Sequence, residues 1–334
     1  TEWADIIIIA PLTATTLSKW ATGNADGLVA SILIANQKPL IVAPAMNNNM
    51  WLNTAVQNNF KKIKTYRNVL PLKPSKGLLA CDQFGIGKIP SNEHIMLALQ
   101  FIIIQNKNFN FLDLSNKSFL ITGGATTEKI DFARSFTNNS SGEMGLCLAQ
   151  IAQLRGAKVK YIHGPLKING NKGEEIEKLE INNSTELNLA IKNEISDYEY
   201  LFMNAAVTDI KLKHDSSSKI PKSELFTHLK NIELVPDILK DVCRYKKNNQ
   251  IFVGFCAFSG SLENLRPVIR DKLNNKNCDL IFANPIDIEG QGFGDSAQNE
   301  GWLFDKNELE FHIKKTSKLD LANKLISKII SIDK

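Results

Sequence analysis

Short apolar runs alternate with amphipathic stretches along the first third of the chain. Residues 6–9 are all isoleucine, a β-branched run typical of a parallel strand buried on both faces. Further apolar runs at residues 39–43 and 68–71 also predict strands, whereas residues 18–34, 54–64 and 94–105 have helical periodicity. The alternation predicts an α/β domain.

A polar, Asn-rich stretch at residues 106–116 then interrupts the pattern and reads as a linker. Beyond it we expect strands at residues 118–122, 158–163, 199–203, 251–255 and 280–283, and helices at residues 144–155, 185–195, 262–274 and 318–330. Residues 302–304 and 308–313 predict a hairpin at a sheet edge. The chain should therefore form two α/β domains, residues 1–110 and 111–334.

The first predicted strand lies unusually close to the N-terminus. A central parallel strand needs a neighbour on each side, yet only residues 1–5 precede this one and the chain has no initiating Met. We therefore expect the first domain to be truncated at its N-terminus.

Composition narrows the class of protein. Hydrophobic residues make up 43% of the 334 residues, and the longest apolar run, residues 95–104, is too short for a bilayer span. Without a signal-peptide pattern, we expect a cytoplasmic protein that binds no membrane. The net charge of +5 is spread without a basic block, which suits small anionic ligands better than nucleic acid. The five cysteines have no metal-ligand spacing and read as reduced thiols.

The most informative segment runs from the strand at Phe119 through Gly123 and Gly124 to Gly145. A strand, a Gly pair and a polar loop leading into a helix can present backbone N–H groups to a phosphate. The spacing matches neither the G-x-G-x-x-G dinucleotide fingerprint nor a Walker loop. An ordinary β-loop-α connection capped by Ser140 or Ser141 is the alternative.

Other candidate residues follow predicted strands. Asn47 and Asp209 each come after an apolar run, where α/β proteins bind ligands, and Cys81 lies in a Gly-flanked loop. Lysines that could neutralise phosphate charge are Lys219, Lys222, Lys272 and Lys276. The alternatives are a turn for the Asn-rich loop, an inert thiol for Cys81 and solvated surface for the lysines.

Taken in order, these segments resemble the bifunctional phosphopantothenoylcysteine decarboxylase/phosphopantothenate–cysteine ligase family over nearly the whole chain. The resemblance implies a truncated flavodoxin-like flavoprotein domain followed by a Rossmann-like ligase domain. In the first domain, Ala10-Pro11-Leu12-Thr13-Ala14-Thr15-Thr16 is similar to the family's FMN-binding segment, with Thr15 in place of the usual Asn. The Pro-x-Met-Asn-x-x-Met-Trp motif is matched by Pro44, Met46, Asn47, Met50 and Trp51.

For this first domain the resemblance implies FMN at Thr13, Ala14, Thr15, Thr16 and Ala45. It also implies substrate binding by Asn47 and a catalytic role for Cys81, which would protonate or reduce the intermediate after decarboxylation. The family's catalytic His precedes the segment with which this chain begins, and none of the five histidines comes before His94. We therefore expect negligible decarboxylation by the chain as written.

The second domain resembles the CTP-dependent ligase half. The family motif is met by Ile121, Thr122, Gly124, Thr126, Glu128, Ile130, Asp131, Arg134, Asn138, Ser140, Ser141, Gly142, Met144 and Gly145. The resemblance implies that Arg134 and Asn138 bind the acyl-cytidylate or its carboxylate, and that Lys219 is needed to form it. The implied CTP-binding residues are Ala205, Asp209, Lys219, Pro236, Asp237, Ile238, Leu239, Phe255, Lys272 and Lys276. Pro221 and Phe258 depart from the family pattern.

The implied reaction joins 4′-phosphopantothenate to cysteine through an acyl-cytidylate formed from CTP. Magnesium would enter with CTP, and Asp209 is a candidate ligand. By resemblance the ligase half forms a homodimer and the decarboxylase half, if intact, a trimer. Two other classes stay open: a Rossmann oxidoreductase, which the Gly spacing disfavours, and a non-catalytic regulatory or interaction protein on the same fold.

Overall fold

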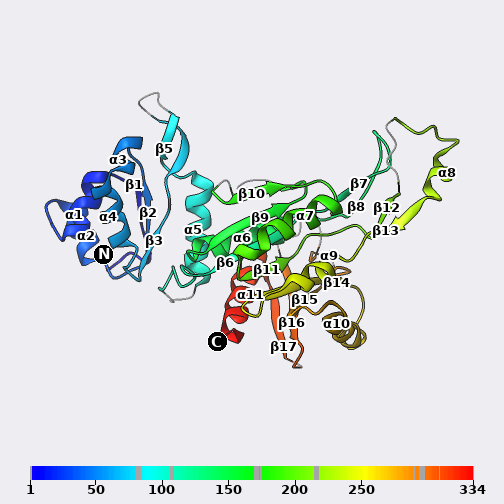
Figure 1. The fold of residues 1–334 in the computed structure, drawn as a ribbon. Helices are drawn as coiled ribbons and strands as arrows, with labels where there is room; N and C mark the ends of the chain where they lie inside the picture. Colours follow the sequence, from blue (N-terminus) through cyan, green and yellow to red (C-terminus); the bar gives the residue numbers. More distant parts are fainter. Residues whose placement is uncertain are drawn as a thin grey trace. The chain divides into compact units, whose positions relative to one another are not determined.

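The computed structural model describes residues 2–79, 84–105, 109–168, 173, 175–213, 218–288, 290–292, 298–307 and 309–333. The chain divides into two compact units (Figure 1). Unit 1 comprises Thr1–Ser115 with Leu154–Ala157, and unit 2 comprises Asn116–Gln153 with Lys158–Lys334. In the described part of the chain, no helix is both long and apolar enough to cross a bilayer.

Unit 1 is built on a parallel sheet in the order β1-β2-β3, formed by β1 (Ile7–Leu12), β2 (Leu40–Pro44) and β3 (Val69–Pro71). An antiparallel hairpin, β4 (Ser75–Leu78) and β5 (Phe84–Lys88), follows. The helices of this unit are α1 (Ala14–Thr22), α2 (Leu28–Ala35), α3 (Asn48–Leu52), α4 (Thr54–Ile63) and α5 (Asn92–Ile104). Every residue of β2 is buried, as its apolar run predicts.

Two of the expectations for unit 1 need refinement. The single helix predicted over residues 18–34 is wrong, because the chain forms α1 and α2 instead. Gly23 and Gly27, with φ of +77° and +94°, break the helical path in a backbone region that other residues avoid. Strand β1 lies at the edge of the described sheet, and Ile8 on it is 39% exposed.

Unit 2 is built on an eight-stranded sheet in the order β10-β9-β6-β11-β14-β15-β16-β17. Its strands are β6 (Ser118–Gly123), β9 (Lys158–His163), β10 (Glu177–Glu180), β11 (Tyr200–Met203), β14 (Ile251–Phe258), β15 (Leu280–Pro285), β16 (Gln298–Asp305) and β17 (Glu310–Ser317). The first six in sheet order are parallel, and β16 and β17 form the predicted antiparallel hairpin at the edge.

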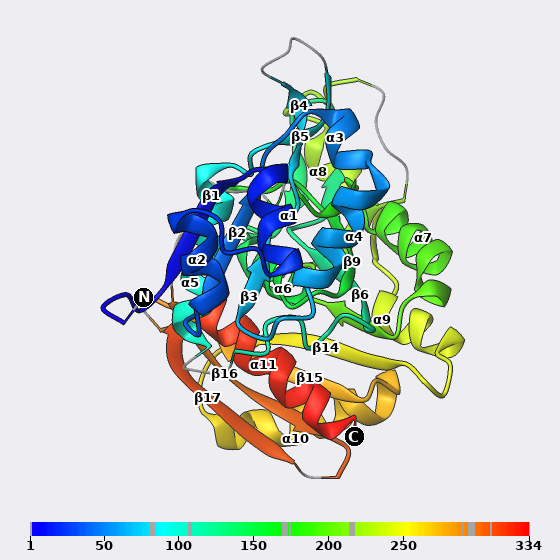
Figure 2. The same ribbon diagram turned by 90° about the vertical axis from the view of Figure 1, so that its left-hand side faces the viewer.

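The helices of unit 2 cover this sheet. They are α6 (Glu143–Leu154), α7 (Ser184–Glu194), α9 (Ile238–Val242), α10 (Leu262–Lys276) and α11 (Lys318–Ile332), with short 3-10 turns at Ile195–Asp197 and Cys243–Tyr245. Apolar side chains of α7, α9 and α10 share one core with the sheet. Helix α11 packs on the β16–β17 hairpin (Figure 2).

The path of the chain reverses direction at the centre of this sheet. From β6 it passes through α6 to β9 on one side, and after α7 it returns to β11 on the other side of β6. In open α/β sheets the carboxyl ends of strands flanking such a reversal form the ligand-binding crevice. The loops after Gly123 and Met203, at the carboxyl ends of β6 and β11, are therefore the expected location of a ligand site.

Two small hairpins and a short helix form an arm at one end of unit 2 (Figure 1). They are β7 (Thr127–Lys129) with β8 (Ser135–Thr137), β12 (Ile210–Leu212) with β13 (Ile232–Leu234), and α8 (Leu225–Leu229). A separate apolar cluster centred on Ile130, Leu212 and Ile220 holds the arm together. Strands of three residues are too short to leave a readable alternation, so the sequence did not predict the arm.

Candidate functional site

Backbone hydrogen bonds join the loops that follow β6 and β11. The Ala206 N–H donates to the Gly124 carbonyl at 2.8 Å, and the Thr126 N–H donates to the Ala206 carbonyl at 3.1 Å. The Ala205 N–H donates to Thr122 Oγ1 at 3.0 Å. The two segments that the sequence analysis singled out separately, the Gly pair and residues 205–209, therefore form one structure at the chain reversal.

Glycines at this point allow the start of α6 to approach the end of β6. A Cβ on Gly145 would lie 2.9 Å from the Gly123 Cα, closer than carbon atoms pack. Ser140 Oγ and Ser141 Oγ accept from the N–H groups of Gly142 and Glu143 at 3.3 and 3.4 Å. The serines thus cap this turn as the simple-connection alternative predicted, while the loop before them lies at the crevice.

Asn138 links the loop after β8 to the loop after β11. Its Nδ2 donates to the carbonyls of Val207 and Ala206 at 3.0 and 3.3 Å. Among the described residues its Oδ1 has no hydrogen-bond partner, so that oxygen stays able to accept from a ligand. Asp209 lies exposed two residues beyond Val207, and its carbonyl accepts from the Val235 N–H at 2.9 Å.

Arg134 is fixed by a buried carboxylate. Its Nε donates to Asp131 Oδ2 at 3.0 Å, and its Nη2 contacts the same oxygen and donates to the Ile220 carbonyl at 2.7 Å. The Ile220 N–H returns to Asp131 Oδ2 at 3.1 Å. The Arg134 guanidinium, together with backbone N–H donors, holds the pKa of Asp131 well below its usual range. Lys219, the predicted catalytic lysine, is exposed immediately before this contact.

The two lysines of α10 lie beside the strand and turn that were predicted to bind nucleotide. Lys272 Nζ lies 3.0 Å from Cys256 Sγ on β14, next to Phe255. Lys276 Nζ pairs with Asp237 Oδ2 at 3.0 Å, and Asp237 caps α9 by accepting from the Lys240 N–H at 3.0 Å. Ile238 and Leu239 are buried in the core, where they support the turn. Cys256 is a contact that the sequence reading missed, because a thiol inside a strand looks like core filler.

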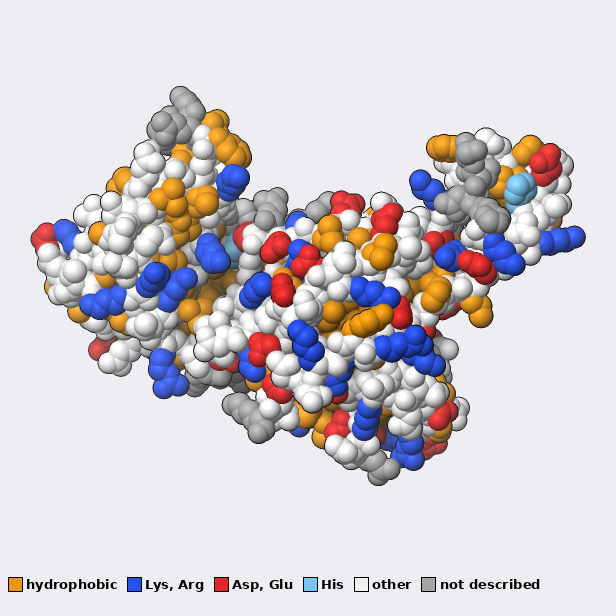
Figure 3. Space-filling model, viewed as in Figure 1, with side chains coloured by type: hydrophobic (Ala, Val, Ile, Leu, Met, Phe, Trp, Pro, Cys, Tyr) orange, Lys and Arg blue, Asp and Glu red, His pale blue; other side chains and the backbone are white. Residues whose placement is uncertain are grey.

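Unit 1 carries an apolar cavity of about 550 Å³ beside the carboxyl end of β2. It is lined by Pro11, Ala45, Met46, Asn47, Leu78, Leu79, Gly87, Lys88 and Ile89. Apolar side chains also gather on the face of unit 1 next to β5 (Figure 3). Ala45 and Asn47 lie where the sequence predicted a site, whereas Leu78, Leu79 and Ile89 were not predicted. Cys81 lies outside the described residues.

Side chains predicted to bind FMN, at Thr13, and substrate, at Asn47, flank this region as helix caps. Thr13 Oγ1 accepts from the Thr16 N–H at 3.3 Å at the start of α1, the helix that carries Ala14 and Thr15. Asn47 Oδ1 accepts from the Asn49 N–H at 2.8 Å at the start of α3. The Ala45 N–H donates to the Leu12 carbonyl at 3.1 Å and ties the two strand ends together.

The β4–β5 hairpin forms one wall of the cavity by docking on the loop after β2. The Met46 N–H donates to the Gly87 carbonyl at 2.9 Å, and the Ile86 N–H donates to Asn48 Oδ1 at 3.0 Å. A Cβ on Gly87 would lie 2.1 Å from the Met46 carbonyl oxygen, so this approach requires glycine. The alternation of Gly85, Ile86 and Gly87 was the signal that could have revealed the hairpin.

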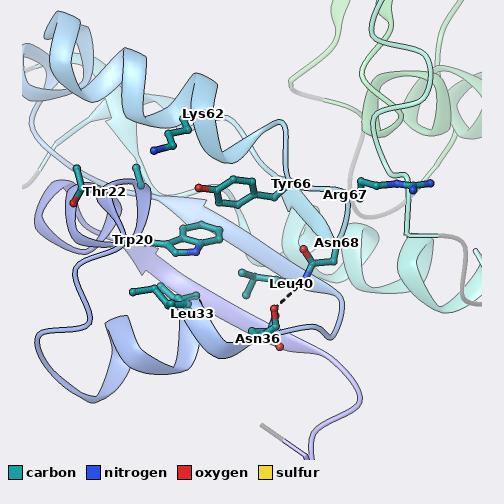
Figure 4. Close-up of a pocket in the computed structure, with 12 residues that line it drawn as sticks. Trp20, Thr22, Leu33, Asn36, Leu40, Lys62, Tyr66, Arg67 and Asn68 are labelled. Atoms are coloured by element: carbon teal, nitrogen blue, oxygen red, sulfur yellow. Dashed lines mark hydrogen bonds between the residues drawn. The ribbon is translucent and has the colours of Figure 1, made fainter.

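A second cavity of unit 1, about 480 Å³, lies where β2 and β3 begin (Figure 4). Trp20 and Tyr66 meet edge to face in it, with ring centroids 5.6 Å apart. The amides of Asn36 and Asn68 both bond to the Lys38 carbonyl, at 2.8 and 2.9 Å, and so close the local turn. None of the sequence-predicted site residues lines this cavity, and it lies at the strand edge opposite the usual ligand crevice.

No group of three or more His, Cys, Asp or Glu side chains within the described ranges could hold a metal ion. Asp209 stays the predicted protein ligand.

Comparison with known proteins matches both units to one kind of protein. The family model "DNA/pantothenate metabolism flavoprotein C-terminal domain" matches residues 114–332, and the model "Flavoprotein" matches residues 1–103. The coenzyme A biosynthesis bifunctional protein CoaBC of Borreliella burgdorferi is 35% identical over 326 residues, covering 97% of this chain and 79% of that protein. CoaBC of Bacillus subtilis is 33% identical, covering 100% and 79%.

Solved structures agree for the larger unit. The crystal structure of the C-terminal domain of CoaBC has a TM-score of 0.53 at 26% identity, covering 65% of this chain and 96% of that domain. A Cab2 mutant, with a TM-score of 0.51 at 15% identity over 73% of this chain and 93% of its own, shares the fold.

Proposed function

The chain belongs to the CoaBC family of bifunctional coenzyme A biosynthesis enzymes, which pair phosphopantothenoylcysteine decarboxylase with phosphopantothenate–cysteine ligase, and we propose that unit 2 catalyses the CTP-dependent ligation. The main support for the proposal is a set of hydrogen bonds that joins the loop from Gly124 to Asn138 to residues 205–209. The two segments meet where the path of the chain through the sheet reverses direction. This arrangement supports a nucleotide and a carboxylate bound side by side.

The proposed chemistry has two steps. A carboxylate oxygen of 4′-phosphopantothenate attacks the α-phosphorus of CTP, and the bond to pyrophosphate breaks to leave an acyl-cytidylate. The cysteine amine then attacks the acyl carbon, CMP leaves, and the nitrogen loses a proton to give the amide. Both steps need correct positioning and neutralisation of developing negative charge more than a protein nucleophile.

We assign roles to side chains according to where they lie. Lys219 is exposed and neutralises charge on the α-phosphate during the first step, with Mg²⁺ carried by CTP and contacted by Asp209. Asn138 and Arg134 face the acyl group, and the free Oδ1 of Asn138 accepts from the cysteine amine. The cytidine lies on Ala205, Phe255 and the turn from Pro236 to Leu239, while Lys272 and Lys276 bind the triphosphate. Lys276 must then exchange Asp237 for phosphate oxygens.

The test is pyrophosphate release with CTP, Mg²⁺, 4′-phosphopantothenate and cysteine. We expect turnover by the unmodified chain and its loss in Lys219→Ala and Asn138→Ala. The exposed Lys219 should be replaced without a change in melting temperature, whereas Asn138→Ala loses its bonds to two carbonyls and should melt slightly lower while staying folded at the assay temperature. A folded, unmodified chain that releases no pyrophosphate would contradict the ligase proposal. CTP-independent binding of a protein partner in its place would favour the non-catalytic alternative.

For unit 1 we propose an FMN site at the 550 Å³ cavity. The flat, largely apolar isoalloxazine ring matches a cavity whose walls are Pro11, Ala45, Met46, Leu78 and Ile89. Hydroxyls and backbone N–H groups of residues 13–16 would bind the polar end of FMN, and Asn47 would bind the substrate. Bound FMN would supply the redox chemistry of the family's decarboxylation of 4′-phosphopantothenoylcysteine, for which Cys81 is the predicted proton donor, and we keep the expectation that this turnover is negligible in the chain as written.

We also propose that the protein assembles with copies of itself. Large apolar side chains on the arm of unit 2 are left on the surface: Phe132 is 77% exposed, Phe226 80% and Leu234 78%. A homodimer that buries these side chains would explain why three large apolar residues of the arm are exposed. Light scattering of the unmodified chain and of Phe226→Ser would measure this directly.

A further inference from the structure

Both backbone polar groups of Ile220, the residue after Lys219, bond to one ion pair. Asp131 Oδ2 accepts from the Ile220 N–H at 3.1 Å, and Arg134 Nη2 donates to the Ile220 carbonyl at 2.7 Å. Most backbone groups in loops bond to neighbouring backbone or to water. Here two charged side chains from a hairpin about ninety positions earlier bind the N–H and the carbonyl of a single residue.

The ion pair is itself rigid. Asp131 Oδ1 accepts from the N–H groups of Ala133 and Arg134 at 2.8 and 2.9 Å, and Oδ2 accepts from Arg134 Nε at 3.0 Å. The Arg134 carbonyl accepts from the Ile130 N–H at 2.9 Å and closes the turn between β7 and β8. The Asp131 side chain has no exposed surface, so it touches protein and not substrate.

Packing beneath the pair fixes the same segment from the apolar side. The Ile220 side chain is 3% exposed and lies in a cluster with Ile130 and Leu212. Pro221 restricts Ile220 to an extended backbone and needs no hydrogen bond to its own nitrogen. Pro221, which departs from the family pattern, is therefore compatible with the bonds from Ile220 to Asp131 and Arg134. Lys219 is exposed next to Ile220, which these bonds hold in place.

Resting on the proposed function, we infer that Asp131 and Arg134 form a clamp on the backbone N–H and carbonyl of Ile220 that positions Lys219 against the α-phosphate. The clamp lies on the β7–β8 hairpin, and β8 leads directly to Asn138, which bonds to Val207. Lys219 and Asn138 are thus held by the same hairpin. Asp131 is a positioning residue. Arg134 has two roles: it helps to position Lys219, and it contacts the acyl group.

The first readout tests the clamp without any turnover. In Asp131→Asn the Ile220 N–H loses its ionised acceptor, so we expect its amide hydrogen to exchange with solvent at least about tenfold faster. Asp279→Asn is the matched control, because Asp279 Oδ2 likewise accepts from a backbone N–H, that of Phe252 at 2.7 Å, at the opposite end of the sheet. Unchanged exchange at Ile220 in Asp131→Asn would overturn the clamp.

The second readout tests what the clamp does. We expect Asp131→Asn to lower kcat for pyrophosphate release by about 10²-fold, the cost of misplacing a catalytic group by an ångström, with KM for CTP within about threefold. Asp279→Asn should keep the unmodified kcat. Faster exchange at Ile220 with an unchanged kcat would overturn the positioning role. If the unmodified chain releases no pyrophosphate, the proposed function fails, and the positioning role falls with it, whereas the exchange result still decides the clamp.

A second substitution tests whether the two residues act as one device. Arg134→Lys keeps the charge but cannot bind Asp131 and the Ile220 carbonyl together with a planar fork. If they act as a unit, the double variant Asp131→Asn/Arg134→Lys should lose no more activity than the worse single variant. Losses that multiply would show that Arg134 acts only through the substrate and would overturn the clamp as a single device.

Discussion

The two units place their candidate sites at the same kind of location but build them differently. Each site lies where parallel strands end, at β2 in unit 1 and between β6 and β11 in unit 2. The cavity of unit 1 has mostly apolar walls, and one of them is a hairpin docked by two backbone-directed hydrogen bonds. The candidate site of unit 2 is polar: the loops after β6 and β11 are joined by backbone hydrogen bonds and by the Asn138 side chain.

This difference follows from what each site is proposed to do. A flat ring is bound by shape and exclusion of water, so apolar walls and a close-fitting glycine are enough. A reaction that develops negative charge on phosphate needs fixed donors and cations, because groups that must reorganise during the reaction lose most of their effect. Unit 2 accordingly attaches its polar side chains to hairpins, strands and one buried ion pair.

The largest expected effect tests the polar network of unit 2. In Asn138→Asp the side chain loses both donor hydrogens and places a carboxylate against the carbonyls of Val207 and Ala206. We expect pyrophosphate release to fall by about 10²- to 10³-fold, as when a preorganised donor is removed from an active site. Asn277→Asp, the same change at the C-cap of α10, should leave the rate unchanged. Equal rates for both variants would contradict the proposed role of Asn138.

Unit 1 should instead be sensitive to shape. Gly87→Ala places a Cβ against the Met46 carbonyl and should destabilise unit 1 by about 1–3 kcal/mol, the usual cost of overpacking. Gly77→Ala is the control in the same hairpin, because its Cβ would meet only the flexible Lys88 side chain at 3.3 Å. Urea unfolding followed by tryptophan fluorescence measures the stability of the variants, and gel filtration measures whether they retain FMN. A stable Gly87→Ala protein would mean that the hairpin moves freely.

Single helices and strands were easier to predict from the sequence than contacts between distant segments. Strand β9 matches the predicted range, and β2, α4, α6, α7 and α11 differ by only one or two residues at their ends, because long apolar periodicity determines them. The break between α1 and α2 was missed, although Gly23 and Gly27 were visible in the sequence. The crevice of unit 2 depends on which strands become neighbours, and one sequence does not specify that. The contact between Asp131 and Ile220 spans 89 positions, so no local pattern predicts it.

A smaller effect separates binding from folding in unit 2. Lys276→Ala should raise KM for CTP by about tenfold, the value of one charge-assisted hydrogen bond. Its pair with Asp237 is partly exposed, with 26% and 39% of the two side chains accessible, so the free energy of unfolding should change by less than about 1 kcal/mol. Lys306→Ala removes an exposed lysine on the same unit and should change neither quantity. Lost stability with an unchanged KM would make Lys276 purely structural.

The smallest effect near neutral pH concerns the Asp131 carboxylate. Because its pKa is lowered in the folded protein, the stability it provides is fully present above the unfolded pKa, about 3.9, and is lost as pH falls through the folded pKa. The melting temperatures of the unmodified protein and Asp131→Asn should therefore differ by a constant amount between pH 8 and about pH 5 and converge only in stronger acid. The cavity of unit 1 has no carboxylate among its lining residues. The difference in melting temperature between Gly87→Ala and the unmodified protein should therefore stay the same over the whole pH range. A difference in melting temperature that stays constant into strong acid would mean that folding leaves the pKa of Asp131 unchanged and that Arg134 does not stabilise its ionised form.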